Sequence, residues 1–441
     1  MKIKLMVSIL FFAMVLTGRA QTELTAEQAI ELGLQHNFSI QIARNNADMA
    51  ENNTGLGRAG FLPTLDVNGN ANLSQSEQET NNQFSVGSSE SSSLRGQVSL
   101  NWTLFDGFAM FADNQRFEEL ERLGKAQARN TIENTVVAIL AAYFNLVQQQ
   151  QLLDVAERTL EISETRLNKE RVRNELGGAS SVDLLNAQVA FNQDKTNLLQ
   201  RQLQVEIARK DLNLLLGQHP DTRINVEERT DIRALSHDYE TLLQMARESN
   251  SGLVLARQSK NVADQQVRLA RSFFYPRLLF NAGYNYNENI TERDAVDENS
   301  FFPPRIESTN QDMSVGLTLQ FNVFNGFRRT INVQNAKIEA RNQELALQDA
   351  LNNLDGWVKE KYLVFQQRMQ VVELERENVK AAEQNLELQT ERYQVGASTS
   401  LEFRDAQLNL SRAQNTLITA LFQARLSRLE IEQLVGNIEI N

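Results

Sequence analysis

The sequence of 441 residues contains no cysteine, five prolines and three histidines. Without cysteine the chain gains no disulfide, and no lipid can be attached to a cysteine near its N-terminus. The histidines, His36, His219 and His237, stand alone and lack the spacing of metal ligands. The prolines, at 63, 220, 276, 303 and 304, all lie outside the segments that we predict as helical, which supports those segments as uninterrupted helices.

Long apolar runs are also absent beyond the N-terminus, so we expect no membrane-spanning helix there. The chain begins Met-Lys-Ile-Lys, continues with an apolar run from Leu5 to Leu16 and reaches small residues at Ala20. This pattern predicts a signal peptide over residues 1–20, and the run is too short for the alternative, a membrane anchor. Its removal leaves 41 basic against 56 acidic residues, which argues against nucleic acid as a partner. Barrel strands remain possible, because their hydrophobicity is hidden in alternation.

What the sequence does contain is one very long helical segment, Ala109 to Asn174. Apolar residues recur there at intervals of seven: Ile132, Ile139, Leu146, Leu153, Leu160 and Leu167. This period predicts a long helix in a coiled-coil-like seam, roughly 100 Å in length. We expect Tyr143, within this stretch, to be a packing residue, as well as its counterpart Tyr362.

The same segment occurs twice. An offset of 219 residues converts the six apolar positions into Leu351, Val358, Phe365, Val372, Val379 and Leu386. The offset also converts Phe105-Asp-Gly-Phe108 into Phe324-Asn-Gly-Phe327. A register held over this length indicates an internal duplication. We place repeat one at 21–228 and repeat two at 229–441.

Each repeat also contains two stretches with a period of two, preceded in repeat one by a helical pattern from Leu24 to Arg58. Apolar residues alternate with small polar ones, many of them Asn, at about 64–74, 94–104, 277–287 and 312–323. Their length suits tilted strands of a membrane barrel with a wet lumen, and the alternative is a pair of soluble hairpins on a helix. We expect polar loops over Ser76–Ser93 and Glu288–Gln311.

After each strand pair the long helix leads to a glycine turn and a returning helix, which gives helical hairpins at 108–216 and 327–435. The fold class is thus a β-barrel combined with a long α-helical barrel. Four strands cannot close a barrel, and an open edge in lipid leaves backbone groups unpaired. We therefore expect a homotrimer with twelve strands in the outer-membrane lipid and a coiled-coil tunnel of helices.

The duplication, Phe61-Leu-Pro-Thr-Leu65, Phe105-Asp-Gly-Phe108 and Tyr393-Gln-Val-Gly396 followed by Asp405-Ala-Gln407 together resemble the TolC-like outer-membrane efflux protein family. The resemblance implies an outer-membrane exit duct with a tunnel extending into the periplasm. Such a duct receives substrates from an inner-membrane transporter through a periplasmic adaptor (membrane fusion) protein, in tripartite efflux or type I secretion.

The resemblance also implies site residues. The tips that contact the adaptor would be the two glycine turns: Gly177, Gly178, Ala179, Ser180, Gly396, Ala397, Ser398 and Thr399. Asp183, Glu402 and Asp405 open the returning helices and would form a periplasmic gate, since the family has acidic rings at the positions of Glu402 and Asp405. Acids in a first helical turn also suit the helix dipole, and that role alone would explain them. Well-known members carry a latching arginine at the position of Ser398, which this chain lacks.

We find no residues with the pattern of a catalytic, cofactor-binding or metal-binding site, and we expect no enzyme and no cofactor. The G-x-G-x-x-G match at Gly55–Gly60 follows a helix and precedes a strand, the reverse of a dinucleotide-binding context. Two other functions stay open: a structural coiled-coil envelope protein and a passive outer-membrane pore. The sequence names neither the substrate, the pump, the adaptor nor the resting state of the channel.

Overall fold

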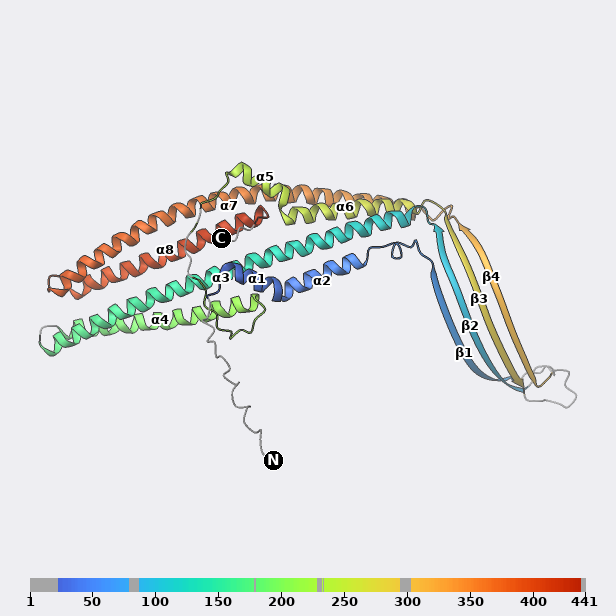
Figure 1. The fold of residues 1–441 in the computed structure, drawn as a ribbon, viewed down its shortest axis with the longest axis horizontal. Helices are drawn as coiled ribbons and strands as arrows, with labels where there is room; N and C mark the ends of the chain where they lie inside the picture. The colour runs from blue at the N-terminus through green and yellow to red at the C-terminus, as the bar shows by residue number, and fades with distance from the viewer. Residues whose placement is uncertain are drawn as a thin grey trace, which may run out of the picture. The chain divides into compact units, whose positions relative to one another are not determined.

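The structure, a computed structural model, describes residues 23–78, 87–177, 180–227, 232, 234–293 and 303–437, so the expected signal peptide lies outside the described residues. Its elements follow one order twice (Figure 1). The first set is α1 (Ala26–His36), α2 (Phe38–Asn52), β1 (Thr64–Gln78), β2 (Gly87–Phe105), α3 (Ala109–Glu175) and α4 (Ser181–Leu215). The second is α5 (Tyr239–Ser249), α6 (Ser251–Ser272), β3 (Arg277–Arg293), β4 (Arg305–Gln320), α7 (Arg328–Gln394) and α8 (Ser400–Leu434). The predicted tandem order of helices and strands is confirmed.

The chain divides into two compact units. Unit 1 comprises residues 1–44, 128–253 and 351–441 and contains α1, α4, α5, α8 and the turn-side parts of α3 and α7. Unit 2 comprises residues 45–127 and 254–350 and contains the four strands with the parts of α2, α3, α6 and α7 that adjoin them.

The helical pattern predicted over Leu24–Arg58 is broken in the structure at Asn37, which separates α1 from α2. The Asn37 side chain accepts hydrogen bonds from the backbone N–H groups of Ser39 and Ile40, at 2.9 and 3.2 Å. Its amide nitrogen donates to the carbonyl oxygen of Leu215 at 2.8 Å. Asn37 therefore ends one helix, caps the next and binds the end of α4, none of which disturbs the apolar periodicity.

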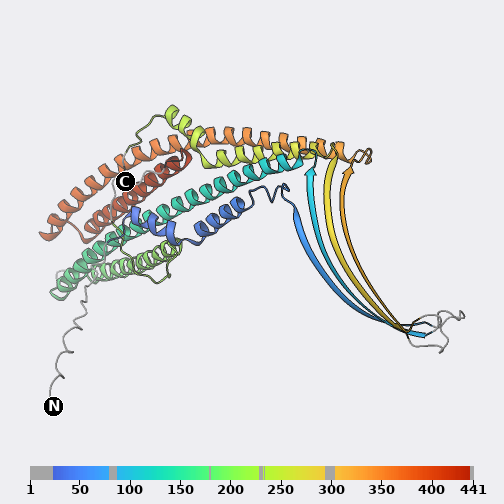
Figure 2. The same ribbon diagram turned by 45° about the vertical axis from the view of Figure 1, so that its right-hand side comes forward.

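Unit 2 contains one antiparallel sheet with strand order β1-β2-β3-β4, seen as four curved neighbouring strands in Figures 1 and 2. The register places apolar residues in one cross-strand row: Val67, Val98, Tyr284 and Met313. The next row, on the opposite face, is polar: Asn68, Gln97, Asn285 and Asp312. One face of the sheet is thus apolar and the other is rich in amides, as the alternation predicted.

The strands differ in length from the prediction. Within the expected loops Ser76–Ser93 and Glu288–Gln311, residues 76–78, 87–93, 288–293 and 305–311 continue the strands, because serine and threonine pair across them. Ser91 Oγ, for example, lies 3.1 Å from Thr291 Oγ1. At its other end β4 stops at Gln320, short of the expected Val323. There the Arg329 guanidinium group donates to the Asn322 carbonyl oxygen at 2.6 Å, so that carbonyl group has its partner outside the ladder.

A strained turn connects β2 to α3. Gly107 and Phe108 both have positive φ angles, 76° and 70°. A Cβ atom on Gly107 would lie 2.4 Å from the Ser272 carbonyl oxygen, so only glycine allows this approach. The left-handed conformation costs a phenylalanine roughly 1–2 kcal/mol. The Phe108 ring makes edge-on contacts with the rings of Phe105 and Tyr275, at centroid distances of 5.2 and 5.8 Å, and these contacts offset part of that cost.

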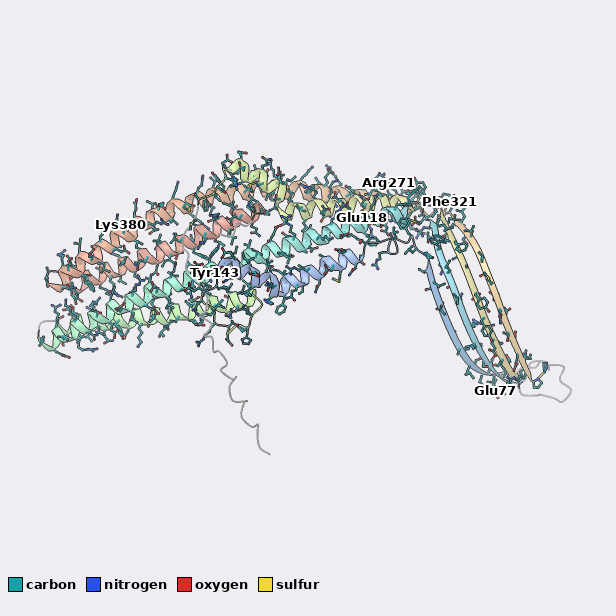
Figure 3. All side chains as sticks on the ribbon, in the orientation of Figure 1. Glu77, Glu118, Tyr143, Arg271, Phe321 and Lys380 are labelled. Carbon is teal, nitrogen blue, oxygen red and sulfur yellow. The ribbon has the colours of Figure 1, made fainter. Side chains whose placement is uncertain are left out.

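The core of unit 1 forms around the centre of α3. Ile139 and Leu146 are fully buried there, and Tyr143 lies between them with 4% of its surface exposed. The Tyr143 hydroxyl group contacts the carbonyl oxygens of Leu24 and Glu227 at 3.0 and 3.1 Å. Figure 3 labels Tyr143 within the helical part of the chain. Tyr143 is therefore more than the packing residue predicted, because it also joins the beginning and the end of the first repeat. Burial, as the main cause, raises its pKa to about 12.

In the described part of the chain one helix, α3, contains an 18-residue window with a mean hydropathy of 1.2, long and apolar enough to cross a membrane. The expectation of no membrane-spanning helix after the N-terminus rests on the absence of a continuous apolar run there. Of that window, 44% is buried within the structure, which is what the predicted seam requires.

Candidate functional site: the hairpin turns and the polar layer beside them

The turn between α7 and α8 is closed by glycine and capped by hydroxyl groups. Gly396 has a φ angle of 77°, and the N–H group of Ala397 donates to the Arg392 carbonyl oxygen at 2.8 Å. These are features of a helix C-terminus that is capped by a glycine in the left-handed conformation. Thr399 then caps α8 together with Glu402, whose backbone N–H donates to Thr399 Oγ1 at 3.1 Å. The sequence Gly-Ala-Ser-Thr thus ends one helix and starts the next.

The turn between α3 and α4 has the same construction where it is described. Gly177 has a φ angle of 76°. Ser180 caps α4, since its Oγ atom accepts from the N–H group of Asp183 at 3.2 Å. The predicted tip residues Gly178 and Ala179 lie outside the described residues.

The structure separates the roles of the two acids expected in the gate of the second repeat. Glu402 Oε2 accepts from the Thr399 N–H at 2.8 Å and lies within 3.1 Å of Ser398 Oγ. The Thr399 backbone hydrogen bond is the main cause that lowers the Glu402 pKa below 4.5. Asp405 is exposed, and among the described residues its carboxylate has no hydrogen-bond or ion-pair partner. Glu402 is therefore engaged as a helix cap, whereas Asp405 presents an unpaired charge.

Beside Asp405, Arg404 points into the protein and makes a buried contact that the sequence analysis missed. Its guanidinium group binds both carboxylate oxygens of Asp194 on α4, at 2.6 and 2.8 Å. The two side chains are 9% and 10% exposed. The pair is bidentate, the strongest geometry for such a contact.

Two further side chains complete this buried polar layer. Arg404 Nη1 also donates to Ser163 Oγ on α3 at 3.0 Å, and Ser163 donates to Asp194. Gln407 donates to the Thr159 carbonyl oxygen at 2.8 Å. The layer of Arg404, Gln407, Asp194 and Ser163 therefore connects α8 of one hairpin with α3 and α4 of the other.

Nearer the turn, Tyr393 of α7 makes a second connection to α3. Its hydroxyl group donates to the fully buried Glu170, and Lys169 Nζ donates to the Tyr393 carbonyl oxygen at 3.0 Å. Burial first, and the hydrogen bond with Glu170 second, raise the Tyr393 pKa to about 12. The Tyr393 ring stacks on Phe403 with a centroid distance of 4.8 Å.

Arg166 lies beside these two connections with 5% of its surface exposed. Its Nε and Nη1 atoms have no hydrogen-bond partner among the described residues. Burial and then the charge of Arg404 lower its pKa. The contact region between the hairpins is therefore polar and charged, unlike the apolar core around Tyr143.

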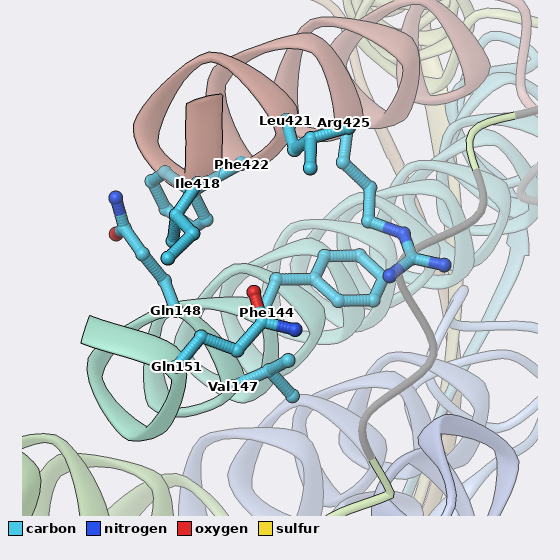
Figure 4. A pocket seen from close by; sticks show the side chains of 8 residues that line it. All are labelled: Phe144, Val147, Gln148, Gln151, Ile418, Leu421, Phe422 and Arg425. Carbon is cyan, nitrogen blue, oxygen red and sulfur yellow. The ribbon is translucent and has the colours of Figure 1, made fainter. Parts of the chain in front are cut away.

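A cleft between α3 and α8 in unit 1 is too small to be a ligand site. It is lined in part by Phe144 and Arg425, whose guanidinium carbon lies 4.5 Å from the Phe144 ring centroid (Figure 4). Its volume of about 20 Å³ has room for about one water molecule. Among the described residues no group of three or more His, Asp or Glu side chains could hold a metal ion.

Comparison with known proteins identifies the class. The family described as outer membrane efflux protein matches residues 29–218 and 242–437. The outer membrane efflux protein BepC of Brucella suis is 20% identical over 418 residues, which cover 94% of this chain and 85% of BepC. Outer membrane protein TolC of Vibrio cholerae is 22% identical over 387 residues, which cover 86% of this chain and 83% of TolC. The crystal structure of the Campylobacter jejuni CmeC outer membrane channel has a TM-score of 0.76 at 13% identity and covers 93% of this chain and 85% of CmeC.

Tandem hairpins joined to a sheet with one apolar and one amide-rich face define the class of outer-membrane channels with a helical tunnel. This chain belongs to the outer membrane efflux protein family. The predicted function in efflux and the predicted location, in the outer membrane with the tunnel extending into the periplasm, are confirmed.

Proposed function

We propose that three copies of this chain form the exit duct of a tripartite efflux or type I secretion system. The observation that carries the trimer is the open sheet. In the described part of the chain, β1 and β4 each have one unpaired edge. In lipid, unpaired N–H and C=O groups cost several kcal/mol each, so the sheet has to close with other copies. Three copies give twelve strands, enough for an aqueous lumen lined by the amide-rich face.

The glycine turns are the docking sites for a periplasmic adaptor in this proposal. They expose Leu176, Val395 and Leu401, whose exposed fractions are 81%, 80% and 69%. Apolar side chains at a turn are favourable when a partner covers them. An adaptor that covers both turns would connect the duct to an inner-membrane transporter.

The gate of the duct is assigned to the acids that follow the turns. Asp405 is the member of this set best suited to act on ions, because its charge is unpaired. Asp183 and Glu402 are engaged in caps and would contribute through their charge alone. In a trimer the three Asp405 carboxylates would lie around one axis and favour cations.

The duct is tested by fractionation and gel migration. The mature chain should be recovered with outer membranes and migrate as a trimer that heating converts to a monomer. Recovery of a soluble monomer would contradict the proposal and favour a structural envelope protein.

Export separates the duct from a passive pore. Deletion should abolish the export of a drug or protein cargo, and expression of the wild-type chain should restore it. Replacing Ala397 and Ser398 of the second turn by tryptophan should prevent export while trimers remain in the membrane. Equal export by this variant would place the adaptor elsewhere, and an export-competent deletion strain would support the passive pore.

A further inference from the structure

One surface of unit 2 has the composition of a binding site. It is a cleft of about 220 Å³ between the start of α3 and the end of α6. Its walls include Phe108, Phe111 and Tyr275, which are 56%, 55% and 52% exposed. Arg268 and Arg271 also line it, and no acidic side chain does so among the described residues. Figure 3 labels Arg271 close to the junction of helices and strands.

The two arginines of the cleft differ in whether their guanidinium groups have a hydrogen-bond partner. Arg268 donates to Gln115 Oε1 at 2.9 Å. The guanidinium group of Arg271 has no hydrogen-bond or ion-pair partner within the described residues. Arg271 lies in the last turn of α6, where a cation complements the helix dipole, but that role requires no aromatic walls.

The shape of the cleft is fixed by the strained turn that precedes α3. Gly107 approaches the end of α6 so closely that a Cβ atom would lie 2.6 Å from the Tyr275 Cβ atom. This approach holds the Phe108 ring edge-on against Tyr275 at 5.8 Å. Leaving a phenylalanine in the left-handed conformation and half-exposed is unfavourable in water, but is compatible with a site that an apolar group fills.

The cleft is continuous with the apolar face of the sheet. Trp102 belongs to the same face as Val98, and its indole N–H donates to the Phe61 carbonyl oxygen at 2.9 Å. The Phe61 ring in turn contacts Phe111 edge-on at 5.0 Å. Aromatic side chains of barrels concentrate at the membrane interface, which is where the phosphate groups of phospholipids lie.

We infer that this cleft binds one phospholipid molecule of the membrane leaflet next to the helices. The Arg271 guanidinium group binds the lipid phosphate, because its planar donors match phosphate oxygens. Phe108 and Phe111 contact the glycerol and the first acyl carbons, and the acyl chains continue along the apolar face of the sheet. The inference depends on the outer-membrane location of the chain and not on its adaptor or pump.

Native mass spectrometry of the purified full-length protein in detergent tests this inference. Phosphatidylglycerol should be retained at one molecule per chain. Diacylglycerol, which lacks the phosphate, and inorganic phosphate, which lacks the chains, should both be retained weakly. Arg271→Gln should weaken phosphatidylglycerol binding by about 10-fold, the size expected for one lost charge-assisted pair. Phe111→Ala should weaken it as well.

The matched control is Arg341→Gln, which removes an equal charge from an exposed arginine of α7 that pairs with Glu344 at 2.9 Å. It should retain phosphatidylglycerol like the wild type. Equal losses in Arg271→Gln and Arg341→Gln, or no loss in either, would overturn the site. Wild-type binding of diacylglycerol as tight as that of phosphatidylglycerol would overturn the role of the phosphate. Arg271-dependent binding of inorganic phosphate alone would overturn the assignment to lipid. The comparison of the three probes on wild-type protein holds even where a variant fails to fold.

Discussion

Glycines with the same backbone conformation differ in what surrounds them in this chain. Gly217 and Gly396 have φ angles of 68° and 77°. A Cβ atom on Gly217 would lie 2.4 Å from the His36 carbonyl oxygen, whereas nothing lies within 4 Å of one on Gly396. Gly396→Ala should therefore lower the free energy of unfolding only by the strain of a left-handed alanine, about 1 kcal/mol. Gly217→Ala should lower it by about 3 kcal/mol or more, because the added Cβ atom also collides with the backbone. Urea unfolding of the two variants measures the difference, and equal costs would mean that α1 moves freely away from Gly217.

The repeat counterparts Tyr143 and Tyr362 differ in their hydroxyl groups. Tyr143 contacts two backbone carbonyl oxygens, while the Tyr362 ring contacts Tyr239 at a centroid distance of 5.8 Å. Tyr143→Phe removes this hydroxyl donor, while the Leu24 carbonyl oxygen still accepts from the Glu227 N–H at 3.1 Å. The variant should therefore reduce the free energy of unfolding by about 0.5–1.5 kcal/mol, the net value of one hydrogen bond. Tyr362→Phe is the control and should change it by less than about 0.5 kcal/mol.

The raised pKa of Tyr143 leads us to expect that the fold loses stability at alkaline pH. Burial raises the Tyr143 pKa from 10.0 to about 12 in the folded chain, so the unfolded chain loses the proton first. The stabilisation is complete below pH 10 and is lost as the pH rises through 12. Tyr143→Phe should flatten this part of the stability profile, and Tyr393, also raised to about 12, accounts for the remainder. An unchanged profile would contradict the assignment to Tyr143.

At the scale of elements, the two hairpins contact each other through charges as well as through apolar residues. Removing one partner of a buried ion pair costs about 3–5 kcal/mol, whereas replacing both partners by apolar residues is often neutral. Arg404→Ala should therefore destabilise the fold by that amount, and Arg404→Leu combined with Asp194→Leu should recover most of it. Thermal unfolding of the single and double variants measures these changes. As a control, removal of Arg341 from its exposed pair with Glu344 should change the stability by close to zero. A double variant as unstable as the single one would show that Ser163 and Gln407 depend on the pair.

The sheet offers a matched test of its two faces. Val98 and Leu317 belong to the apolar face, while Ser99 and Thr318 belong to the polar one. Arginine at either apolar position should cost roughly 2–4 kcal/mol near the centre of the bilayer, and arginine at either polar position should be tolerated. Folding into lipid vesicles, followed by heat-modifiable migration, measures both. Equal effects on the two faces would contradict the assignment of the apolar face to lipid.

These elements show what the sequence determines by itself. The period of seven predicts α3 and α7, and the period of two predicts the strands, because both patterns are local. The break at Asn37 escapes prediction, since a buried asparagine leaves the apolar period unchanged. The pair of Arg404 and Asp194 escapes it too, because 210 residues separate two polar positions that the sequence alone assigns to solvent. A signal was present nonetheless, since the spacing places Asp194 on the same face of α4 as the small apolar residues Ala187 and Ala190, and the structure buries this face.

At the scale of the whole molecule, the proposed trimer accounts for features that are unexplained in a single chain. The open sheet, the half-exposed aromatic residues at the strand ends and the apolar residues at the turns are all unfavourable for an isolated chain in water. Other copies, lipid and an adaptor would each cover one of them. The unpaired Asp405 is a different case, because in the proposed gate its charge would lie next to a water-filled tunnel, would need no cover and would act on the ions that pass.

Planar-bilayer conductance tests this role for Asp405. Asp405→Asn should reduce both the cation preference of the channel and its block by multivalent cations added from the tunnel side, because three unpaired carboxylates are lost from one ring. Glu402→Gln should have the smaller effect, since its carboxylate already accepts from the Thr399 N–H at 2.8 Å. Glu344→Gln, far along α7 from this turn, should leave selectivity unchanged. If Asp405→Asn combined with Glu402→Gln alters neither selectivity nor block, neither acid acts on the passing ions and other residues form the constriction.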